Sequence, residues 1–435
     1  MEQFGRGDWP IASRPTLTRS THGKGWRVRV LVLALAFVAA HSTGSAAAAG
    51  VTLAEAIPLA LAHNPDLAAT AQELRVAAGE QIRAGYLSQF NPQLDSEFDY
   101  RPRDHRSNSQ DWRVGLSQEL EIFGQRALRM KSANLGYAET AALVRDRRRL
   151  LTAAVRMTFL EALRAKQQLA LVGELERLDS RLLTAARARL KAGEIGYIDY
   201  NLAEVRHGQS ARALLEARQR YQLQCTSLGR LLGGAAGPQP EPAGDFDLKL
   251  SGFDVESLLA AAHRNRPDLR AREIELARLD AEAALNRRLV LPNPRIGAFG
   301  GHELNAEHPF GVSLSFPLPL FNRRQAEVAI IDARRRQADY RLAANKLDID
   351  KEVRDAYIAY TTASRALAIY QDEVLAPARE SFSLLERAFQ AGKIDLLSVS
   401  VAERQAYDAR ASYLDTWFSV RAAEVALELA TGGGM

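Results

Sequence analysis

The sequence predicts a mainly α-helical protein with a small β part, arranged as two tandem repeats of long antiparallel helices plus a β-hairpin. Composition is the first observation: 47% of the 435 residues are hydrophobic but only 7% are aromatic, which favours long helices rich in alanine and leucine. The second is a set of short motifs that recur about 200 residues apart. The third is one pair of segments in each repeat where apolar and polar residues alternate, as in β-strands.

Five landmarks recur in the same order at offsets between 198 and 202 residues. They are HNPDL at 63–67 with NRPDL at 265–269, NPQL at 91–94 with NPRI at 293–296, LSQELEIFGQR at 116–126 with LSFPLPLFNRR at 314–324, AGEI at 192–195 with AGKI at 391–394, and the glycine pairs at 233 and 432. We therefore predict a first repeat at 51–234, a Gly/Pro-rich linker at 235–250 and a second repeat at 251–434.

Residues 1–48 are predicted to be a cleaved secretory signal peptide. Lys24, Arg27 and Arg29 precede an apolar run at 30–40, and small residues with an Ala-x-Ala pattern follow. The run is too short to span a bilayer as a helix, which takes about 20 residues.

The leader also accounts for most of the basic charge. Residues 1–50 hold six Lys/Arg and two Asp/Glu, which leaves 51 basic and 50 acidic residues in the rest of the chain. The pI of 9.3 is therefore no argument for a nucleic-acid partner. The one cysteine, Cys225, lies in a helical pattern and is expected to be a buried structural thiol.

Each repeat is predicted to open with two helices. In the first repeat Thr52 and Glu55 form a capping box, and Asn64-Pro65 supplies an N-cap and a first-turn proline for the second helix. We expect that helix to end near Asn91-Pro92, because proline disfavours a helical conformation in the residue before it.

Two strands and a helical hairpin follow in each repeat. The strands are expected at about 93–101 and 112–122, and again at about 295–301 and 310–317. Long helices at 125–191 and 324–390 come next, the second capped by Asn322 with Gln325 and kinked or interrupted by Pro377. The hairpin tips are expected at about 192–199 and 391–398.

The strand segments place their apolar residues on one face. These positions are Leu94, Phe98, Tyr100, Trp112, Val114, Leu116, Leu120, Phe310, Val312 and Leu314. The opposite face carries polar residues, among them Asp95, Glu97, Asp99, Ser117, Glu119 and Glu121. Such alternation fits a half-buried soluble sheet or a membrane β-barrel with lipid outside and water inside. Four strands cannot close a membrane barrel, which needs about eight, but three chains would supply twelve.

Several segments together resemble the TolC family of trimeric outer-membrane efflux ducts, from about Val51 to Gly434. They are TLAEAIPLALAHNPDLAA, SQELEIFGQRALR, FPLPLFNRRQ and the paired AGEI and AGKI turns. ELEIFGQR and PLPLFNRRQ look most like the CzcC-like branch, which is associated with export of divalent heavy-metal cations. The resemblance implies a homotrimer whose 12-stranded β-barrel in the outer membrane of a Gram-negative bacterium continues into an α-helical tunnel across the periplasm. It also implies docking to a periplasmic adaptor, or membrane fusion protein, and to an inner-membrane RND-type pump.

The resemblance extends to the hairpin tips, which in the family contact the adaptor. RLKAGEIGYID matches the family's pattern at Arg189, Leu190, Gly193, Ile195 and Asp199. The second tip keeps Arg387, Gly392 and Ile394, but has Ser398 where the first tip has Asp199. Family members close the tunnel with carboxylates near the tips, for which the candidates are Asp199 and Asp395; a solvated turn is the alternative for either.

The most metal-like cluster is His302, Glu303, Glu307 and His308 in the second hairpin loop, but its spacing matches no standard zinc pattern and favours a solvated loop. No phosphate-binding glycine loop, nucleophile elbow or HExxH motif occurs. We therefore predict passive conduction, with no enzyme activity, catalytic residue, cofactor or resident metal.

Two alternatives remain open from the sequence. A soluble periplasmic coiled-coil adaptor or scaffold would also have helical hairpins, although it need not duplicate the whole unit. Within the channel class, a drug efflux or protein secretion duct would have the same architecture.

Overall fold

The computed structural model describes residues 50–101, 109–245, 250–303, 307–390 and 396–433. The described residues all belong to one compact unit, Gly50–Met435. The predicted signal peptide at 1–48 lies outside the described residues.

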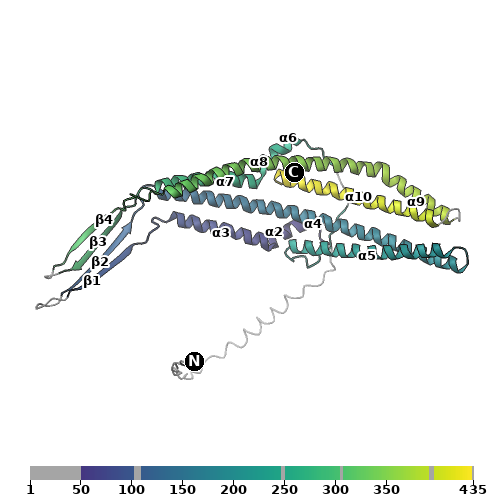
Figure 1. The fold of residues 1–435 in the computed structure, drawn as a ribbon, viewed down its shortest axis with the longest axis horizontal. Helices are drawn as coiled ribbons and strands as arrows, with labels where there is room; N and C mark the ends of the chain where they lie inside the picture. Colours follow the sequence, from purple (N-terminus) through teal and green to yellow (C-terminus); the bar gives the residue numbers. More distant parts are fainter. Residues whose placement is uncertain (1–49, 102–108, 246–249, 304–306, 391–395, 434–435) are drawn as a thin grey trace, which may run out of the picture. The chain divides into compact units, whose positions relative to one another are not determined.

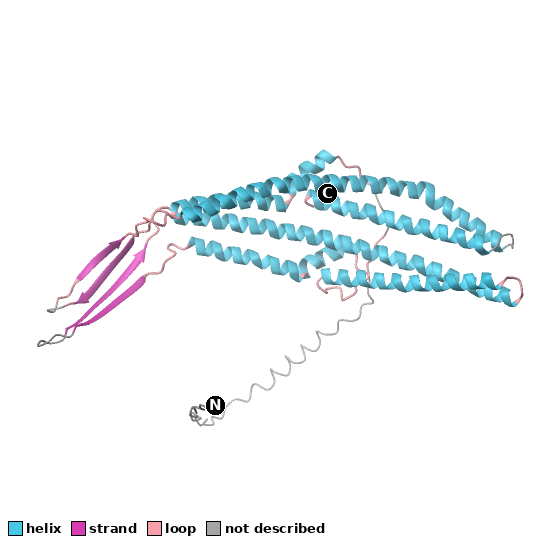
Figure 2. Ribbon diagram, viewed as in Figure 1, coloured by secondary structure: helices cyan, strands magenta, loops and turns pink. Residues whose placement is uncertain are grey.

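The elements follow the same order in both halves of this unit. The first half contains α2 (Leu53–His63), α3 (Pro65–Gly85), β1 (Gln93–Arg101), β2 (Ser109–Glu119), α4 (Gln125–Lys191) and α5 (Tyr197–Leu231). The second contains α6 (Val255–Asn265), α7 (Pro267–Arg288), β3 (Arg295–His302), β4 (Phe310–Ser315), α8 (Gln325–Ile369), the π-helix η2 (Tyr370–Val374), α9 (Leu375–Gln390) and α10 (Leu396–Thr431). Within the unit, the four strands lie together beyond one end of the long helices (Figures 1 and 2).

The first two helices begin as their sequence signals predict. The Thr52 N–H and hydroxyl both donate to the Glu55 carboxylate, at 2.9 and 2.8 Å. Asn64 Oδ1 accepts a hydrogen bond from the Leu67 N–H at 3.0 Å, and Pro65 occupies the first turn of α3. These bonds satisfy N–H groups that have no partner inside the helix.

α3 ends at Gly85 rather than near Asn91-Pro92, so the predicted end was wrong by about two turns. Two arginines of α4 explain the early end. Arg126 donates to the Gly85 carbonyl at 3.1 and 2.9 Å, and Arg129 donates to the Ala84 carbonyl at 3.1 Å. Since these bonds satisfy the last carbonyls of the helix, α3 can end before it reaches Pro92.

The predicted capping box at the start of α8 is also wrong. The residue that precedes α8 is Arg324, in a left-handed conformation with φ of 56°. Asn322 instead accepts from the Arg324 N–H at 2.9 Å, and Gln325 Oε1 accepts from the Arg323 N–H at 2.8 Å. Gly124, with φ of 78°, holds the equivalent place before α4.

Pro377 interrupts the second long helix, as predicted. The π-helix at Tyr370–Val374 separates α8 from α9 and ends three residues before the proline. Proline cannot donate an N–H and its ring crowds the carbonyl four residues earlier, which is Glu373 inside the π-helix. α4, which lacks a proline, runs unbroken for 67 residues.

The two hairpins form one four-stranded antiparallel sheet in the order β1-β2-β3-β4. β2 and β3, from different repeats, pair along residues 112–119, where Leu116 lies opposite Ala298. β1 and β4 are the edges of this sheet. An edge strand presents unpaired N–H and C=O groups that can pair with another chain.

The helical core is shared by the two halves. Its larger cluster includes Val155, Phe159 and Leu228 from the first half with Trp417 and Val420 from the second, each no more than 3% exposed. Burying a large apolar side chain stabilises by about 1.5–3 kcal/mol, so this cluster holds α4, α5 and α10 together. Among the described residues, no helix is both long and apolar enough to cross a membrane.

The closing glycines of each half pack against the junction of its two short helices. A Cβ added to Gly233 would lie 2.2 Å from the His63 carbonyl oxygen. A Cβ added to Gly432 would lie 2.9 Å from the Asn265 carbonyl carbon. Both glycines also have positive φ, 65° and 98°. The HNPDL and NRPDL motifs therefore recur together with the closing glycines because they are in contact.

The segment after α5 is tied to the beginning of the described chain. The Val51 N–H donates to the Glu241 carbonyl at 2.8 Å, and the Ala243 N–H donates to the Val51 carbonyl at 2.9 Å. The described part of the predicted linker is therefore anchored; residues 246–249 lie outside the description.

Cys225 on α5 is 3% exposed, as predicted for a structural thiol. Burial raises the pKa of this thiol, with the Tyr221 hydroxyl beside it. A covered, neutral thiol behaves as a small apolar side chain, so Cys225 contributes to packing.

Candidate functional site

One face of the sheet is apolar and exposed. Residues paired across antiparallel strands project to the same face, as Leu94 and Leu116 do. The register places nine of the ten predicted lipid-facing residues on this side, and their exposed fractions run from 37% to 91%. They are Leu94, Phe98, Tyr100, Trp112, Val114, Leu116, Phe310, Val312 and Leu314. A contiguous exposed apolar surface marks contact with a membrane or another protein.

β3 completes this face in a way that the sequence conceals. Ala298 pairs with Leu116 on one side and Val312 on the other, while Ile296 pairs with Leu314. The alternate positions of β3 are Arg295, Gly297, Phe299 and Gly301. Because only Arg295 at the start of the strand is polar, the period-two alternation that reveals the other strands is absent from the rest of β3.

Leu120 does not lie in a strand, contrary to the prediction of a strand to residue 122. β2 ends at Glu119, and the Leu120 N–H makes a last hydrogen bond to the Pro294 carbonyl at 2.9 Å. Pro294 and Pro292 have no N–H with which to continue the ladder. Leu120 is therefore a half-buried residue of the turn into the helices rather than a lipid-facing strand position.

The opposite face of the sheet is polar. β1 contributes three exposed carboxylates to it, Asp95, Glu97 and Asp99. Asp95 accepts hydrogen bonds from Gln93 at 2.7 Å and from Ser117 at 3.4 Å. With one face apolar and the other hydrated, the sheet is suited to separate lipid from water.

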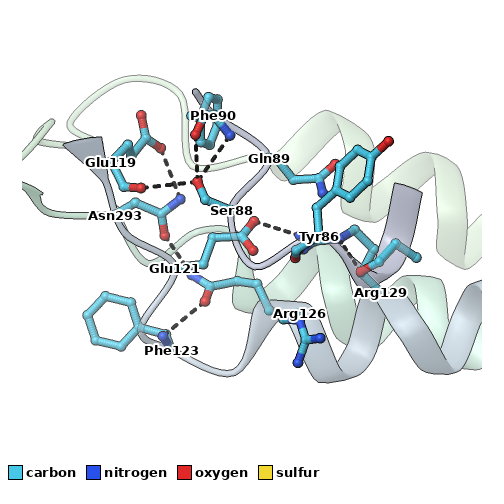
Figure 3. Close-up of polar contacts among 12 residues, drawn as sticks. Tyr86, Ser88, Gln89, Phe90, Glu119, Glu121, Phe123, Arg126, Arg129 and Asn293 are labelled. Atoms are coloured by element: carbon cyan, nitrogen blue, oxygen red, sulfur yellow. Dashed lines mark hydrogen bonds and ion pairs between the residues drawn. The ribbon is translucent and has the colours of Figure 1, made fainter. Parts of the chain in front are cut away.

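The junction between sheet and helices contains a buried ion pair instead of a pore-facing carboxylate. The Glu121 side chain is 3% exposed and pairs with Arg129 at 2.6 Å. Arg129 also donates to the carbonyls of Ala84, at 3.1 Å, and Tyr86, at 3.3 Å (Figure 3). The expectation that Glu121 faces the pore is therefore wrong, because the chain has left the strand two residues earlier and turned toward α4.

Glu119 belongs to the same junction. Its carboxylate accepts a hydrogen bond from Asn293 at 3.0 Å, and Asn293 in turn accepts one from Gln125 at 2.9 Å (Figure 3). Gln125 is fully buried, and its side-chain Oε1 accepts a hydrogen bond from the Phe123 N–H at 2.9 Å. This chain of hydrogen bonds joins the two repeats where the sheet becomes a helical bundle, so Glu119 is not a free pore-lining carboxylate either.

The first hairpin tip is a compact glycine turn. Gly193 has φ of 73°, its N–H donates to the Leu190 carbonyl at 3.1 Å, and the Glu194 N–H donates to the Arg189 carbonyl at 2.9 Å. These bonds close the end of α4 in the manner of a glycine C-cap. The Asp199 carboxylate accepts from the Gly196 N–H at 3.3 Å and so caps α5.

The side chains of this tip divide into turn formers and exposed groups. Ile195 and Leu190 are half-buried, whereas Arg189 is exposed. Two exposed apolar side chains that the sequence pattern does not include follow the turn: Tyr197 is 68% exposed and Ile198 is 84% exposed. An apolar residue at a hairpin tip, next to a family motif, is the sequence signal that would have found them.

The second tip is only partly described. Arg387 is exposed on α9 and donates to the Ser383 carbonyl at 3.3 Å. Gly392, Ile394 and the gate candidate Asp395 lie outside the described residues. Of the two gate candidates, only Asp199 is therefore placed, and it is an exposed helix cap.

The family described as "Outer membrane efflux protein" matches residues 56–234 and 258–433. The chain belongs to the outer membrane efflux protein family. This is a family of channels rather than of enzymes. The matched stretches leave out residues 1–55, the segment 235–257 that connects the two halves, and the last two residues.

Two relatives of this efflux protein are similar over most of their length. It is 27% identical over 371 residues to the cobalt-zinc-cadmium resistance protein CzcC of Cupriavidus metallidurans, covering 85% of this chain and 87% of that protein. It is 28% identical over 417 residues to the pyoverdine export outer membrane protein OpmQ of Pseudomonas putida, covering 88% and 86% respectively. The predicted family resemblance is confirmed.

Solved channel structures share the fold. CusC superposes with a TM-score of 0.72 at 20% identity, over 90% of this chain and 96% of that one. The CmeC outer membrane channel of Campylobacter jejuni gives a TM-score of 0.75 at 16% identity, over 88% and 86%. The predicted fold class, mainly helical with a small antiparallel sheet, is confirmed.

The efflux protein also contains a buried charge cluster that joins its two halves. Arg206 on α5 lies 3.4 Å from Asp179 on α4 and 3.3 Å from Glu403 on α10, and both carboxylate side chains are 5% exposed. Burial, together with the Asp179 charge, raises the pKa of Glu403 to about 7. The sequence signal was the position of Asp179 directly after Leu178, one of four leucines (171, 175, 178 and 182) with the 4-3-4 spacing of a coiled-coil seam.

The metal-like cluster of the second hairpin is only partly assembled. The rings of His302 and His308 lie 5.1 Å apart between centroids, while Glu303 pairs with Arg113 at 2.7 Å. Glu307 is exposed. Within the described ranges, no group of three or more His, Cys, Asp or Glu residues is placed to hold a metal ion.

Proposed function

We propose that this efflux-family protein is the outer-membrane channel of a tripartite export system and that its cargo is divalent heavy-metal cations. The observation that carries the channel is the sheet, which has one exposed apolar face and one polar face and leads through a turn into the long helices. The observation that favours metal cargo is the similarity to CzcC together with the carboxylates of β1.

The open edges of the sheet support a homotrimer. Lipid does not tolerate unpaired strand edges, and four strands are too few to close a barrel, which needs about eight. β1 of one copy can pair with β4 of the next, and three copies give twelve strands. The nine exposed apolar residues of β1, β2 and β4 then face lipid, and the polar face lines a water-filled pore.

The carboxylates of β1 give this pore a preference for cations. Asp95, Glu97 and Asp99 recur in each of the three copies, so they form stacked acidic rings. Rings of Asp and Glu in a pore attract cations and repel anions. A divalent metal ion would therefore be favoured over an anionic compound of similar size.

The helix tips are the proposed docking site for a periplasmic adaptor, which connects the channel to an inner-membrane RND-type pump. The first tip offers Arg189 and the exposed Ile198, held in place by the turn at Gly193. The second offers Arg387 and the residues around Gly392 and Ile394. The carboxylates Asp199 and Asp395 remain the gate candidates, and residues 1–48 are proposed to direct export as a cleaved signal peptide.

Metal cargo is tested in cells that lack the gene for this protein. Returning the wild-type gene is expected to restore growth in zinc, cobalt or cadmium. A variant in which Asp95, Glu97 and Asp99 become Asn, Gln and Asn is expected to restore at most about a tenth of that resistance, because the acidic rings are gone. Equal trimer levels in the outer membrane, measured on unheated gels, exclude a folding defect.

A matched control neutralises three exposed helix carboxylates, Glu204, Glu216 and Asp355, and is expected to behave as wild type. The similarity to the pyoverdine exporter makes an iron-chelating siderophore the second candidate cargo. Restored siderophore export without any restored metal resistance would overturn the metal assignment and leave the channel assignment intact.

A further inference from the structure

One aromatic side chain stands on the polar face of the sheet. Phe299 on β3 pairs with Gly115 on β2 and with Gly311 on β4, and the same row of the sheet contains Asp95 on β1. Its neighbours along β3 on this face are Gly297 and Gly301. A half-buried phenyl ring is thus surrounded by glycines on a surface that is otherwise charged or hydroxylated.

The ring lies along the sheet, over β4. A Cβ added to Gly311 would be 2.8 Å from Phe299 Cζ and 3.1 Å from Cε1. A Cβ added to Gly115 would be 3.3 Å from Phe299 Cβ. Because real Cβ atoms do not approach so closely, the ring occupies the space that a side chain at position 311 would need.

Arg113 covers the ring from the other side. Its guanidinium carbon lies 5.3 Å from the centroid of the Phe299 ring, and its Nη2 donates to Glu303 at 2.7 Å. A cation above an aromatic face at this distance is attracted to it. The ion pair with Glu303 fixes the guanidinium in that place, so Phe299 is held between Arg113 and the backbone at Gly311.

We propose that Phe299 determines the width of the pore at its level, and that Gly311 and Arg113 are positioning residues that keep the ring against the wall. The proposal rests on the trimeric barrel described above. In that barrel three Phe299 rings lie at one height. With the rings folded onto Gly311 the pore is wide, and with the rings displaced it becomes a constriction that excludes large solutes. The proposal holds for any cargo.

The test measures access through the barrel from outside, because the helix tips do not affect that path. Ser315 is exposed on the polar face of β4, four residues nearer the helices than Gly311. A Ser315→Cys substitution in a Cys225→Ser background provides a single reporter thiol. Intact cells are treated with a small methanethiosulfonate or with a bulky polyethylene glycol maleimide, and the labelling rates are compared.

Gly311→Leu is expected to slow the bulky reagent at least about tenfold and the small reagent by less than about twofold, because a narrowed pore discriminates by size. Adding Phe299→Ala to Gly311→Leu is expected to restore the labelling rate with the bulky reagent to that of the wild type. The matched control is Gly300→Leu, since an added Cβ at Gly300, on the apolar face, would meet nothing nearer than the Pro309 carbonyl at 3.9 Å. It is expected to change neither rate.

Three results would overturn the proposal. An unchanged bulky rate in a trimeric Gly311→Leu variant would show that the ring does not limit the pore. If that variant does not assemble, Gly311→Ala replaces it, because its added Cβ would lie 2.8 Å from Phe299 Cζ and also displace the ring, and an unchanged rate with the bulky reagent then counts against the proposal. A reporter thiol that even the small reagent cannot reach in the wild-type trimer would refute the barrel itself, which separates that failure from a failure of the Phe299 assignment.

Discussion

Arg324 and Gly124 occupy equivalent turns before α8 and α4, with φ of 56° and 78°. A left-handed conformation costs a residue with a Cβ about 1 kcal/mol more than it costs glycine. Arg324→Gly is therefore expected to raise stability by about 1 kcal/mol per chain, less a small loss from the Arg324 bond to Asn286 at 3.3 Å. The apparent melting temperature of the detergent-solubilised trimer should rise.

The converse change is Gly124→Ala, which should lower stability by about 1 kcal/mol although nothing lies within 4 Å of the added Cβ. Gly208 provides the control, because it lies inside α5, also in open space, and Gly208→Ala should stabilise by about 1 kcal/mol. Shifts of the same sign for the two alanine variants would contradict the conformational explanation.

The buried pair of Glu121 and Arg129 provides a second prediction at this scale. Removing one partner of a buried ion pair leaves an uncompensated charge, which costs about 3–5 kcal/mol. Arg129→Ala should therefore prevent or strongly weaken trimer formation on unheated gels. Arg129→Lys should rescue it poorly, because a lysine cannot reproduce the bonds to both Ala84 and Tyr86.

Lys351→Ala is the control for this pair. Its partner Asp355 is also on the surface, the two side chains being 73% and 58% exposed, so the loss should be below about 1 kcal/mol. Equal effects of Arg129→Ala and Lys351→Ala would mean that the junction does not depend on the buried pair.

At the scale of whole elements, the contact of α10 with α4 and α5 should depend on pH through Glu403. Burial raises the pKa of Glu403 from its ordinary value of 4.5 to about 7. Between these values the folded protein holds a proton that the unfolded chain has released, so stability falls as pH rises across this window. The surrounding charged groups are Asp179 and Arg181 from α4 and Arg206 from α5.

Glu403→Gln should remove most of this dependence and make α10 more stable at pH 8. Amide hydrogen exchange in α10, compared at pH 5.5 and pH 8 after correction for the intrinsic rate, measures the effect. Glu216→Gln, at an exposed position of α5, should leave the wild-type dependence unchanged. If the stability of α10 in the Glu403→Gln variant still fell with pH as steeply as in the wild type, a group other than Glu403 would have to be responsible.

Some elements could be predicted because their causes are local. The faces of β1, β2 and β4 follow from alternation, and α4 lies between two glycines with positive φ, at 124 and 193. The end of α3 and the role of Glu121 could not be predicted, because both depend on arginines of α4 that are held by bonds to carbonyls 41 to 45 residues earlier in the chain. The bond between Gln125 and Asn293 joins residues 168 positions apart, which no local pattern reveals.

The same limit applies to Phe299 and to the cluster around Glu403. Phe299 looks like one more apolar strand residue, and only the register shows that it projects to the polar face. Asp179, Arg206 and Glu403 look like ordinary charged helix residues until α4, α5 and α10 are packed together. In both cases the sequence gives the residue type, but the direction in which the side chain points depends on the tertiary structure.

At the scale of the whole molecule, duplication explains why the two halves interlock. Each half closes on itself through a glycine, Gly233 or Gly432, that approaches its own short helices. Among the described residues the halves join each other at several places, including the pairing of β2 with β3, the bond of Gln125 to Asn293, the ion pair of Arg206 with Glu403 and the core around Trp417. The result is one unit with an internal repeat, whose sheet has two edge strands, β1 and β4.

The two edges of the sheet differ in charge, and this difference restricts how copies can assemble. On the polar face β1 carries three carboxylates at 95, 97 and 99, whereas β4 carries glycine and serine at 311, 313 and 315. Two β1 edges related by a twofold axis would set like charges opposite each other, which is destabilising. A β1 edge against the β4 edge of the next copy avoids this, and such head-to-tail contacts close only as a ring. The acidic stripe thus disfavours a twofold contact between β1 edges and supports the cyclic assembly proposed above.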